Sequence, residues 1–477
     1  MKLQLTRIAI IVFIGIFMTS SASTDAATYS DTYPMLTVLQ TTKVYSKPSL
    51  SAKVLSSIQK GQQYPVLRSS KYYHYISLPD GRFGWVRKRH SGTSDIPLQT
   101  ADSVTVASVL QPTVTVYDGP STRYKSAGIV KKGEEYPVLS VSKYYYKIQV
   151  PGMNNVWISK IKARLTGKPR LVMGWNYYGT TDTFIQQAGN AATIDVVTPR
   201  WFRLKAEAPF VQGSVDLKYV AWAHKEGKQI WTMLGNNFDP DLTNTILSDE
   251  SKRNLLAKTI AEQVIGSGLD GVNVDFENID IRNKEQFVGF IHELKELLAQ
   301  SGKTVSVDVT RENPDPFWSG SYDRKGLGEA ADYVIMMGYD EHWGGRGIAG
   351  SVGSEPWVRE GIRLLLKDVP AHKVLLGVPF YTKEWITDSS GNVTGKDLSM
   401  PQTEKLIRDK NLTPVWDLKT KQHYVEYEEN GHRHQIWIED RSSMTWRWGL
   451  INEYRLGGAA AWAVGMETPD IWSVFSN

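Results

Sequence analysis

The chain has 477 residues, no cysteine, and a formal net charge of +5 with a sequence pI near 8.9. It is longer than one typical domain, so two to four domains are expected, and the lack of cysteine excludes disulfides and thiolate metal sites. The charge is too modest to indicate nucleic-acid binding, but it favours adhesion to anionic surfaces such as cell-wall polymers.

Residues 1–27 have the pattern of a secretory signal peptide. Lys2 and Arg7 give a positive start, residues 8–18 form an apolar core, and Ala22 and Ala27 are small residues suited to cleavage. The core is too short for a comfortable membrane span, so no span is expected after signal removal. An uncleaved anchor is the alternative. A secreted chain without cysteine is typical of a bacterial exterior.

Two copies of one pattern follow, at residues 35–90 and 104–165. Matching residues, such as Trp85 and Trp157, lie a constant 72 positions apart. Short β-rich runs broken by Pro-Ser, Lys-Gly and Pro-Gly signals predict two small all-β barrel modules. The copies resemble bacterial Src-homology-three-like modules, a family that often tethers hydrolases to peptidoglycan. This resemblance implies binding to a cell-wall polymer.

Tyrosines cluster in both copies, at residues 71–73 and 143–145. They could form the binding groove, but aromatic residues of strands often pack in a core instead. Residues 91–103, between the copies, are rich in Gly, Thr, Ser, Asp and Pro and are predicted to be a linker.

From residue 169 to 477, strand and helix patterns alternate. Eight segments have strand character, namely residues 171–175, 193–198, 229–234, 271–276, 304–309, 333–337, 373–378 and 458–463. Helical patterns lie between most of them, for example at residues 249–268 and 284–302. This alternation predicts the α/β class and a TIM (β/α)8 barrel.

Between about residues 387 and 439 the alternation gives way to turns and short strands. Residues 424–427 and 434–438 are expected to pair around the turn at Asn430 and Gly431. The segment therefore predicts a small α+β insertion that walls one side of the cleft. Residues 432–434 include two histidines but no carboxylate at ligand spacing, so an exposed hairpin is expected there and no metal site.

The most informative strand is at residues 269–278, because its polar side chains alternate with apolar ones. Asn273, Asp275 and Glu277 share one face. A solvated edge strand has this pattern, but the flanking helices indicate a βα unit whose strand is covered on both faces. Buried carboxylates are costly unless paired, hydrogen-bonded or protonated. Active-site groups also gather at the carboxyl ends of barrel strands, so a catalytic site is predicted at Glu277.

Four motifs along this region occur in the order expected of one family. They are Asp270, Gly271, Asn273, Asp275 and Glu277 on the fourth strand, residues 336–340 on the sixth, residues 377–381 on the seventh and residues 457–462 on the eighth. Together they resemble the family 18 glycoside hydrolases, whose fourth-strand signature is D-G-x-D-x-D-x-E. The resemblance covers about residues 169–477. It departs at Asn273, where most chitinases have a third carboxylate. Asn273 and residues 340–343 are similar to the branch acting on spore and cell-wall peptidoglycan.

The resemblance implies a role for each residue. Glu277 is the expected general acid, since burial beside an anion can keep it protonated. In this family the nucleophile is the substrate's own 2-acetamido group. Asp275 would hold the acetamide N–H and stabilise the oxazolinium ion, and Tyr339 would donate to the acetamide oxygen. Trp462 would stack under the sugar ring, and Asp340 would help line the subsite.

Four further residues are predicted to contact substrate. Tyr381 ends the seventh-strand motif, while Trp175 and Trp201 lie near predicted strand ends and are candidate sugar platforms. Tryptophans that only pack the barrel are equally common. Asn273 is a neutral amide that can only donate or accept a hydrogen bond, so Asp275 beside it should ionise more simply than in a carboxylate pair. A silent residue is the alternative for Asn273.

These features predict a secreted, retaining glycosidase that cleaves β-1,4 bonds after N-acetylglucosamine in peptidoglycan. It would need no cofactor or metal and would lie at the cell wall or spore envelope of a bacterium. A chitinase or an endo-β-N-acetylglucosaminidase is one alternative, since fold and family do not fix the substrate. A lectin-like barrel that only binds sugar is another, although such relatives typically lose the acid that Glu277 retains.

Overall fold

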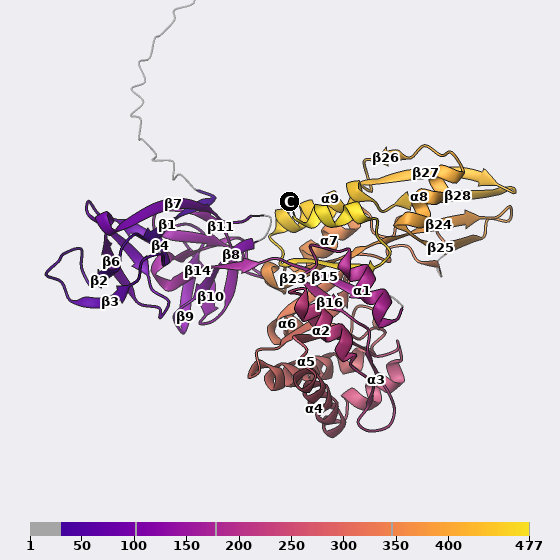
Figure 1. The fold of residues 1–477 in the computed structure, drawn as a ribbon, viewed down its shortest axis with the longest axis horizontal. Coiled ribbons are helices and arrows are strands. Elements are labelled where there is room, and N and C mark those ends of the chain that lie inside the picture. Colours follow the sequence, from indigo (N-terminus) through magenta and orange to yellow (C-terminus); the bar gives the residue numbers. More distant parts are fainter. Residues whose placement is uncertain (1–29, 101–102, 177–178, 345–346, 477) are drawn as a thin grey trace, which may run out of the picture.

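The computed structural model describes residues 30–100, 103–176, 179–344 and 347–476. Two all-β units come first in the chain, a barrel follows, and a strand-rich insertion projects from the barrel on the side away from the units (Figure 1). The predicted signal peptide, residues 1–27, lies outside the described residues. No helix in the described part of the chain has the length and apolar character that crossing a membrane requires.

The first two units have the same architecture. The first contains β1 (Thr32–Val38), β2 (Thr42–Tyr45), β3 (Val54–Ile58), β4 (Gln63–Ser69), β5 (Tyr73–Ser77), β6 (Phe83–Arg87) and β7 (Ser91–Pro97). The second contains β8 (Ser103–Val109), β9 (Thr113–Tyr117), β10 (Ser126–Lys131), β11 (Glu135–Val141), β12 (Tyr145–Ile148), β13 (Val156–Ser159) and β14 (Ala163–Pro169). Their strand orders, β3-β2-β6-β5-β4-β1-β7 and β10-β9-β13-β12-β11-β8-β14, correspond strand for strand. The sequence repeat is therefore a structural repeat.

The predicted linker at residues 91–103 is wrong over most of its length. Ser91–Pro97 forms β7, which pairs with β1 along the whole of both strands. The polar composition of this segment is typical of a linker, but it also suits an edge strand, because an edge strand with a solvated face needs few apolar side chains. Each tyrosine cluster has one residue in the core and one on the surface, where it could line a binding groove. Tyr73 and Tyr145 are buried, whereas Tyr72 and Tyr144 are exposed at equivalent turns.

The predicted barrel is confirmed. Eight parallel strands of the described residues close on one another: β15 (Leu171–Asn176), β16 (Val196–Thr198), β19 (Gln229–Gly235), β20 (Gly271–Asp275), β21 (Thr304–Thr310), β22 (Tyr333–Met337), β23 (Val374–Pro379) and β29 (Gly458–Val464). A short hairpin, β17 (Phe202–Leu204) and β18 (Val211–Gly213), follows β16 and pairs with β19.

Helices surround this barrel. They are α1 (Thr181–Gly189), α2 (Leu217–Lys225), α3 (Pro240–Leu247), α4 (Glu250–Gly266), α5 (Lys284–Ala299), α6 (Arg324–Ala330), α7 (Glu355–Leu365) and α9 (Arg441–Tyr454). Local sequence sets their ends. The Asp249 carboxylate caps α4 by accepting from the backbone N–H groups of Ser251 and Lys252. Gly268, with φ of 72°, follows the end of the helix in the left-handed region.

The barrel interior is apolar at one end and polar at the other. Met173, Trp231, Ile335, Leu375 and Ala460 are among the residues of its apolar layer. Towards the carboxyl ends of the strands, alternation brings polar residues such as Asn273 and Asp308 to the inside. The chemistry is therefore confined to the mouth formed by the carboxyl ends.

The insertion is a five-stranded sheet with one helix. It contains β24 (Tyr381–Thr387), β25 (Val393–Ser399), α8 (Met400–Asp409), β26 (Val415–Asp417), β27 (Gln422–Glu429) and β28 (His432–Ile438), in the order β25-β24-β28-β27-β26. The expected β27–β28 hairpin is present, with Asn430 and Gly431 at positive φ. The insertion starts at Tyr381 because β24 follows almost directly on β23. The expectation of a fully exposed hairpin is wrong at His434, which is buried with Nδ1 2.8 Å from Glu384 Oε1.

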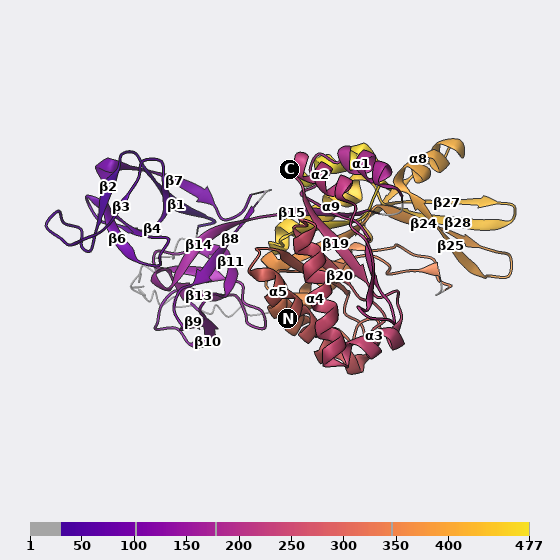
Figure 2. The same ribbon diagram turned by 60° about the horizontal axis from the view of Figure 1, so that its bottom comes forward.

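The second β unit packs against the amino ends of the barrel strands. Two contacts come from residues just before barrel strands: His372 Nε2 lies 3.7 Å from Glu135 Oε2, and Arg455 Nη2 donates to the carbonyl of Leu139 at 3.3 Å. Arg170, just before β15, donates to the carbonyl of Thr100 between the two units. Figure 2 shows the units on one side of the barrel and the insertion on the other. The second unit therefore covers the end of the barrel opposite its mouth, and the first lies beyond it (Figure 1, Figure 2).

Candidate active site

Most of the predicted site residues meet at the carboxyl ends of the strands. The Trp175 and Trp462 ring centroids are 5.8 Å apart, and those of Tyr339 and Tyr381 are 6.3 Å apart. The Tyr381 hydroxyl donates to Asp340 Oδ1. Asp340 has φ of 64°, a left-handed conformation that is uncommon outside glycine and is often found at functional sites.

Asp275 and Glu277 have strongly perturbed titrations. Burial raises the pKa of the Asp275 carboxyl to about 6, although the positive charge of Arg200 opposes the shift. Burial also raises the pKa of Glu277 well above its usual range, and the negative charges of Asp275 and Asp340 raise it further. Of these two carboxyls, Glu277 is therefore the one whose raised pKa favours the protonated form as the pH rises. This is the property required of a general acid.

One oxygen of Asp275 lacks a hydrogen-bond partner. Oδ1 is buried, and no donor among the described residues reaches it. A buried carboxylate oxygen without a donor is costly, and such atoms commonly mark the position that a ligand group completes. The atom is suited to accept a hydrogen bond from a substrate N–H.

Asn236 fixes the backbone of Glu277, and the sequence analysis did not identify it. Its Oδ1 accepts from the Glu277 N–H at 3.0 Å, and its Nδ2 donates to the Glu277 carbonyl at 2.7 Å. The same nitrogen donates to Thr243 Oγ1 at 3.0 Å. Asn236 directly follows β19, so its location at the carboxyl end of a barrel strand was the available signal.

Asn273 lies in a buried network rather than on the cleft surface. Its Oδ1 accepts from Trp175 Nε1 at 2.8 Å, while its Nδ2 donates to Ser306 Oγ at 3.1 Å and to Asp308 Oδ1 at 2.7 Å. Asn273 and Asp308 are almost completely buried. Burial raises the pKa of Asp308 well above its usual range, and the charge of Asp275 adds to the shift. The alternation of Ser306 and Asp308 along β21 was the sequence signal for this missed acid.

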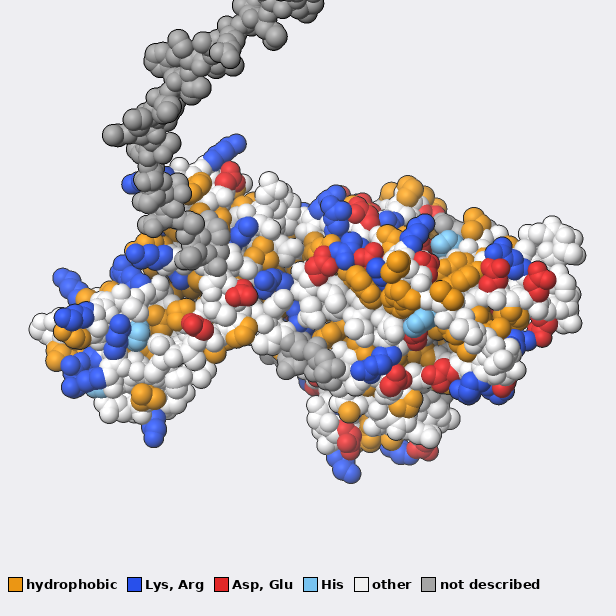
Figure 3. All heavy atoms as spheres, turned by 90° about the horizontal axis from the view of Figure 1, so that it is seen from above, with side chains coloured by type: hydrophobic (Ala, Val, Ile, Leu, Met, Phe, Trp, Pro, Cys, Tyr) orange, Lys and Arg blue, Asp and Glu red, His pale blue; other side chains and the backbone are white. Residues whose placement is uncertain are grey.

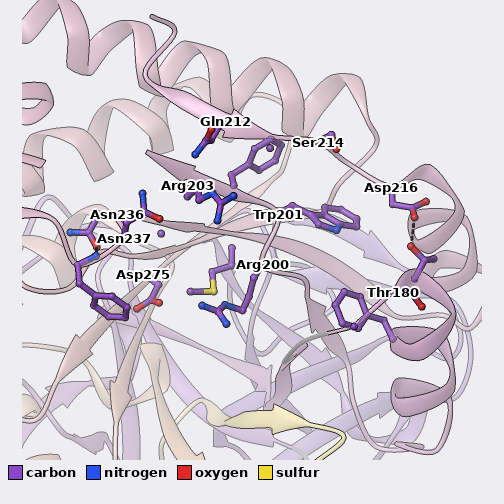
Figure 4. A pocket seen from close by; sticks show the side chains of 18 residues that line it. Thr180, Arg200, Trp201, Arg203, Gln212, Ser214, Asp216, Asn236, Asn237 and Asp275 are labelled. Carbon is purple, nitrogen blue, oxygen red and sulfur yellow. Dashed lines mark hydrogen bonds between the residues drawn. The ribbon is translucent and has the colours of Figure 1, made fainter. Parts of the chain in front are cut away.

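An open cleft of about 790 Å³ leads away from Asp275 between the hairpin β17–β18 and the start of α1 (Figure 4). Trp201 lines this cleft together with Asp275, and its ring centroid lies 6.2 Å from that of Tyr219. Arg200, a further missed residue, has its guanidinium 5.2 Å from the Trp462 ring centroid. The described residues contain no cluster of three or more His, Cys, Asp or Glu that could hold a metal ion.

Paired acidic residues at the mouth of a closed (β/α)8 barrel fit the needs of glycoside cleavage, and comparison with known proteins assigns the chain to a glycosidase family. Residues 174–467 match the model of glycosyl hydrolases family 18. The match covers more than half of the chain, and the chain belongs to this family.

Individual relatives include bacterial lytic enzymes. The chain is 25% identical over 270 residues to the uncharacterized glycosylase YvbX of Bacillus subtilis, covering 54% of this chain and 78% of that protein. It is 28% identical over 241 residues to the cortical fragment-lytic enzyme of Bacillus anthracis, covering 50% of this chain and 56% of the relative. The match thus spans little more than half of the cortical fragment-lytic enzyme.

Solved structures share the fold. The spore cortex-lytic enzyme SleL of Bacillus cereus aligns with a TM-score of 0.60 and 23% identity, covering 64% of this chain and 73% of that one. A chitinase from Chromobacterium violaceum aligns with a TM-score of 0.58 and 25% identity, covering 64% of this chain and 98% of that one. The chain is therefore a family 18 glycosidase related to spore cortex-lytic enzymes, with chitinases also among its relatives.

Proposed function

We propose that the protein hydrolyses the β-1,4 bond on the reducing side of N-acetylglucosamine in peptidoglycan by a retaining, substrate-assisted mechanism. One observation carries this proposal: a carboxyl that favours the protonated form, Glu277, lies close in sequence to a carboxyl oxygen of Asp275 that accepts no hydrogen bond. Glu277 holds a proton because of its raised pKa, and two positions earlier Asp275 presents a buried oxygen without a partner. Asp275 ends β20 and Glu277 lies two residues beyond it at the mouth of the barrel, so both are proposed to reach one sugar.

The reaction follows from these positions. Glu277 gives its proton to the glycosidic oxygen as the bond from C1 to that oxygen breaks. The carbonyl oxygen of the 2-acetamido group attacks C1 from the opposite face, which forms a cyclic oxazolinium ion. Asp275 accepts the acetamide N–H and stabilises the positive charge, while the Tyr339 hydroxyl orients the acetamide oxygen. The Glu277 carboxylate then takes a proton from water, which attacks C1, reopens the ring and restores the original configuration.

Trp462 and Trp175 are proposed to form the floor of the reacting subsite. Trp462 is half-buried, so part of its ring can meet a sugar, and its other neighbours are the Arg200 guanidinium and Trp175. Trp175 itself is almost fully buried. It therefore supports Trp462 and orients Asn273 instead of stacking on substrate. Asp340 and Tyr381 would close the side of the subsite next to the insertion.

Peptidoglycan is the proposed substrate because of the relatives and of the attached β units. The names of several relatives refer to spore cortex or to cortical fragments. We propose further that the two units are Src-homology-three-like modules that hold the secreted enzyme on the wall or spore envelope. Residues 30–100 and residues 103–169 each contain ten Lys or Arg against three Asp or Glu, whereas residues 170–477 contain 33 against 42. Basic side chains spread over the units in Figure 3.

The test is to digest purified peptidoglycan and chitin oligomers and to identify the new reducing ends by mass spectrometry. N-acetylglucosamine at the new ends of peptidoglycan fragments supports the proposal. Muramic acid at those ends rules out the glucosaminidase specificity, and cleavage of chitin alone identifies a chitinase. The Glu277→Gln variant, treated in parallel, separates the activity of the protein from that of a contaminating hydrolase.

A further inference from the structure

The cleft continues from Asp275 towards a guanidinium that the proposed reaction does not use. Strands β17, β19 and β20 lie side by side, and their register pairs Arg203 with Gly235 and Gly235 with Asp275. Neighbouring strands are about 4.8 Å apart, so the backbones of Arg203 and Asp275 are separated by roughly 10 Å. Gly235 has no side chain to stand between them. A Cβ added there would meet no atom closer than 3.8 Å.

The short hairpin directs Arg203 into the cleft. In β17 the flanking Phe202 and Leu204 are buried in the core, so the alternation of a strand turns Arg203 to the other face, where it is exposed. The antiparallel partner of Arg203 on β18 is Gln212, and both line the cleft together with Ser214 (Figure 4). This wall is therefore polar and positively charged.

No carboxylate of the described residues is paired with this guanidinium. Among the interactions of the described residues, Arg203 has neither an ion pair nor a side-chain hydrogen bond. The carboxylates that line the cleft are Asp275, at the reaction centre, and Asp216 at the far end. Asp216 caps α2 by accepting from the Lys218 N–H at 2.8 Å, and its other oxygen accepts from the Thr181 hydroxyl. Both of its oxygens are thus already engaged.

Chitin carries no charge that would use such a group, whereas muramic acid carries a lactyl ether that ends in a carboxyl. That carboxyl is either free or joined to a peptide stem, which has carboxyl groups of its own. A guanidinium binds a carboxylate with two parallel hydrogen bonds and cannot lose its proton near neutral pH. An arginine without a partner, beside amide and hydroxyl donors, is suited to this task.

We propose that Arg203, with Gln212 and Ser214, forms a carboxylate-binding subsite for an acidic sugar next to the one being cleaved. Arg203 is then a specificity-determining residue that makes the cleft favour acidic glycan over neutral glycan. The inference rests on the proposed function, because it concerns a glycan that spans the cleft from Asp275.

The experiment compares glycan strands that differ only in charge. Strands stripped of peptide carry free lactyl carboxyls, and coupling these carboxyls to ammonia gives a neutral counterpart of the same length. The measured quantity is the ratio of kcat/KM on the acidic strands to kcat/KM on the neutral strands. We expect Arg203→Gln to lower this ratio about tenfold, the usual size of a hydrogen bond to a charged group, and Arg203→Lys to retain part of it. Lys225→Gln, an exposed change of equal charge on α2 outside the cleft lining, is the control.

Strands that keep their peptides identify the source of the carboxylate. An effect on stripped strands indicates the lactyl group, and an effect confined to peptide-bearing strands indicates the stem. A ratio that Arg203→Gln leaves unchanged on both kinds of strand overturns the inference, as does an equal fall with Lys225→Gln. Calorimetric binding of the same strands to Glu277→Gln, with and without Arg203→Gln, reports on the subsite without turnover. This binding measurement can therefore test the subsite even if the proposed reaction is disproved.

Discussion

The side-chain amide of Asn273 donates to the carboxyl of Asp308 across neighbouring barrel strands, with Nδ2 2.7 Å from Oδ1. Trp175 fixes the orientation of this amide, because an indole N–H can only donate and therefore requires the Asn273 oxygen. The amide nitrogen is left to face Asp308. Where most chitinases are expected to have a carboxylate on the fourth strand, this chain has a neutral amide there and a buried acid on the fifth.

Asn273→Asp is expected to keep the fold and to change the pH dependence of hydrolysis. The new carboxyl would face Asp308 without a donor between them, so the two oxygens would have to share a proton. Added negative charge beside Asp275 would raise its pKa, and the acidic limb of the pH–rate profile would move to higher pH. The check is kcat/KM measured between pH 4 and 9.

A double variant in which the residues at positions 273 and 308 are exchanged is the control for this prediction. Asn273→Asp combined with Asp308→Asn restores one acid and one amide, and the Asn at 308 can donate back to the Asp at 273. We expect the double variant to recover a profile close to that of the parent. An unchanged profile in the single variant would show that Asn273 does not influence Asp275.

Glu277→Gln is expected to lower kcat on peptidoglycan by about 10² to 10⁴, the usual contribution of a positioned proton donor. The amide has nearly the shape of the acid but no proton of suitable acidity to give to the leaving oxygen. In the parent enzyme, activity should fall as the pH rises through the raised pKa of Glu277, because the acid then loses its proton. Turnover that survives the substitution would contradict the assignment, and retained glycan binding serves as the control for folding.

Asp275→Asn is expected to abolish turnover and to stabilise the fold at high pH. Burial raises the pKa of Asp275 from an ordinary 3.8 to about 6, so the folded state favours the protonated form. This favourable contribution is complete below about pH 4 and is lost as the pH rises through 6, a loss of up to ~3 kcal/mol. An asparagine at position 275 does not ionise, so the variant does not lose this stability as the pH rises.

Thermal unfolding at pH 4 and at pH 8 checks this expectation. The variant should exceed the parent in stability at pH 8 and equal it at pH 4. Asp241→Asn is the comparison, since this carboxylate is exposed on α3, outside the cleft lining. A difference between variant and parent that is equal at both pH values would contradict the assigned titration.

The barrel could be predicted from the sequence because each strand is a short apolar run between helical patterns. The acidic residues at the end of β20 could be predicted for a second reason, because period-two alternation assigns Asn273 and Asp275 to one face and extends to Glu277 just beyond the strand. Periodicity does not identify strands of about three residues, because so short a strand has too few residues to show an alternation. The predicted strand at residues 193–198 forms only over Val196–Thr198, and the three-residue strands of the β17–β18 hairpin were not predicted.

Contacts between strands could not be predicted. Asn236 and Glu277 are 41 positions apart and meet only because β19 and β20 are neighbours. Asn273 was expected to contact substrate or Asp275, but its partners are Trp175, Ser306 and Asp308 from two other strands. A single sequence shows which side chains point inward, whereas the order and register of the strands decide which of them touch.

Wall binding by the full-length protein is expected to weaken steeply with salt. The first two β units hold a large excess of basic residues, and ion pairs to acidic side chains are recorded for few of them, such as Arg82 with Asp80 and Lys168 with Glu135. Exposed charges that meet an anionic polymer are screened within about 8 Å at physiological ionic strength. Sedimentation with purified cell walls from 50 to 500 mM salt measures the effect.

Two lysines at equivalent turns provide the variant for this test. Lys71 Nζ lies 5.1 Å from the Tyr72 ring centroid, and Lys143 Nζ lies 5.2 Å from that of Tyr144. The double change Lys71→Glu and Lys143→Glu should weaken wall binding several-fold and leave kcat on soluble fragments unchanged, because both units lie on the side of the barrel opposite the mouth (Figure 1). Loss of soluble activity would show instead that the units influence the barrel. Binding that is insensitive to both salt and charge reversal would mean that the units recognise an uncharged part of the wall.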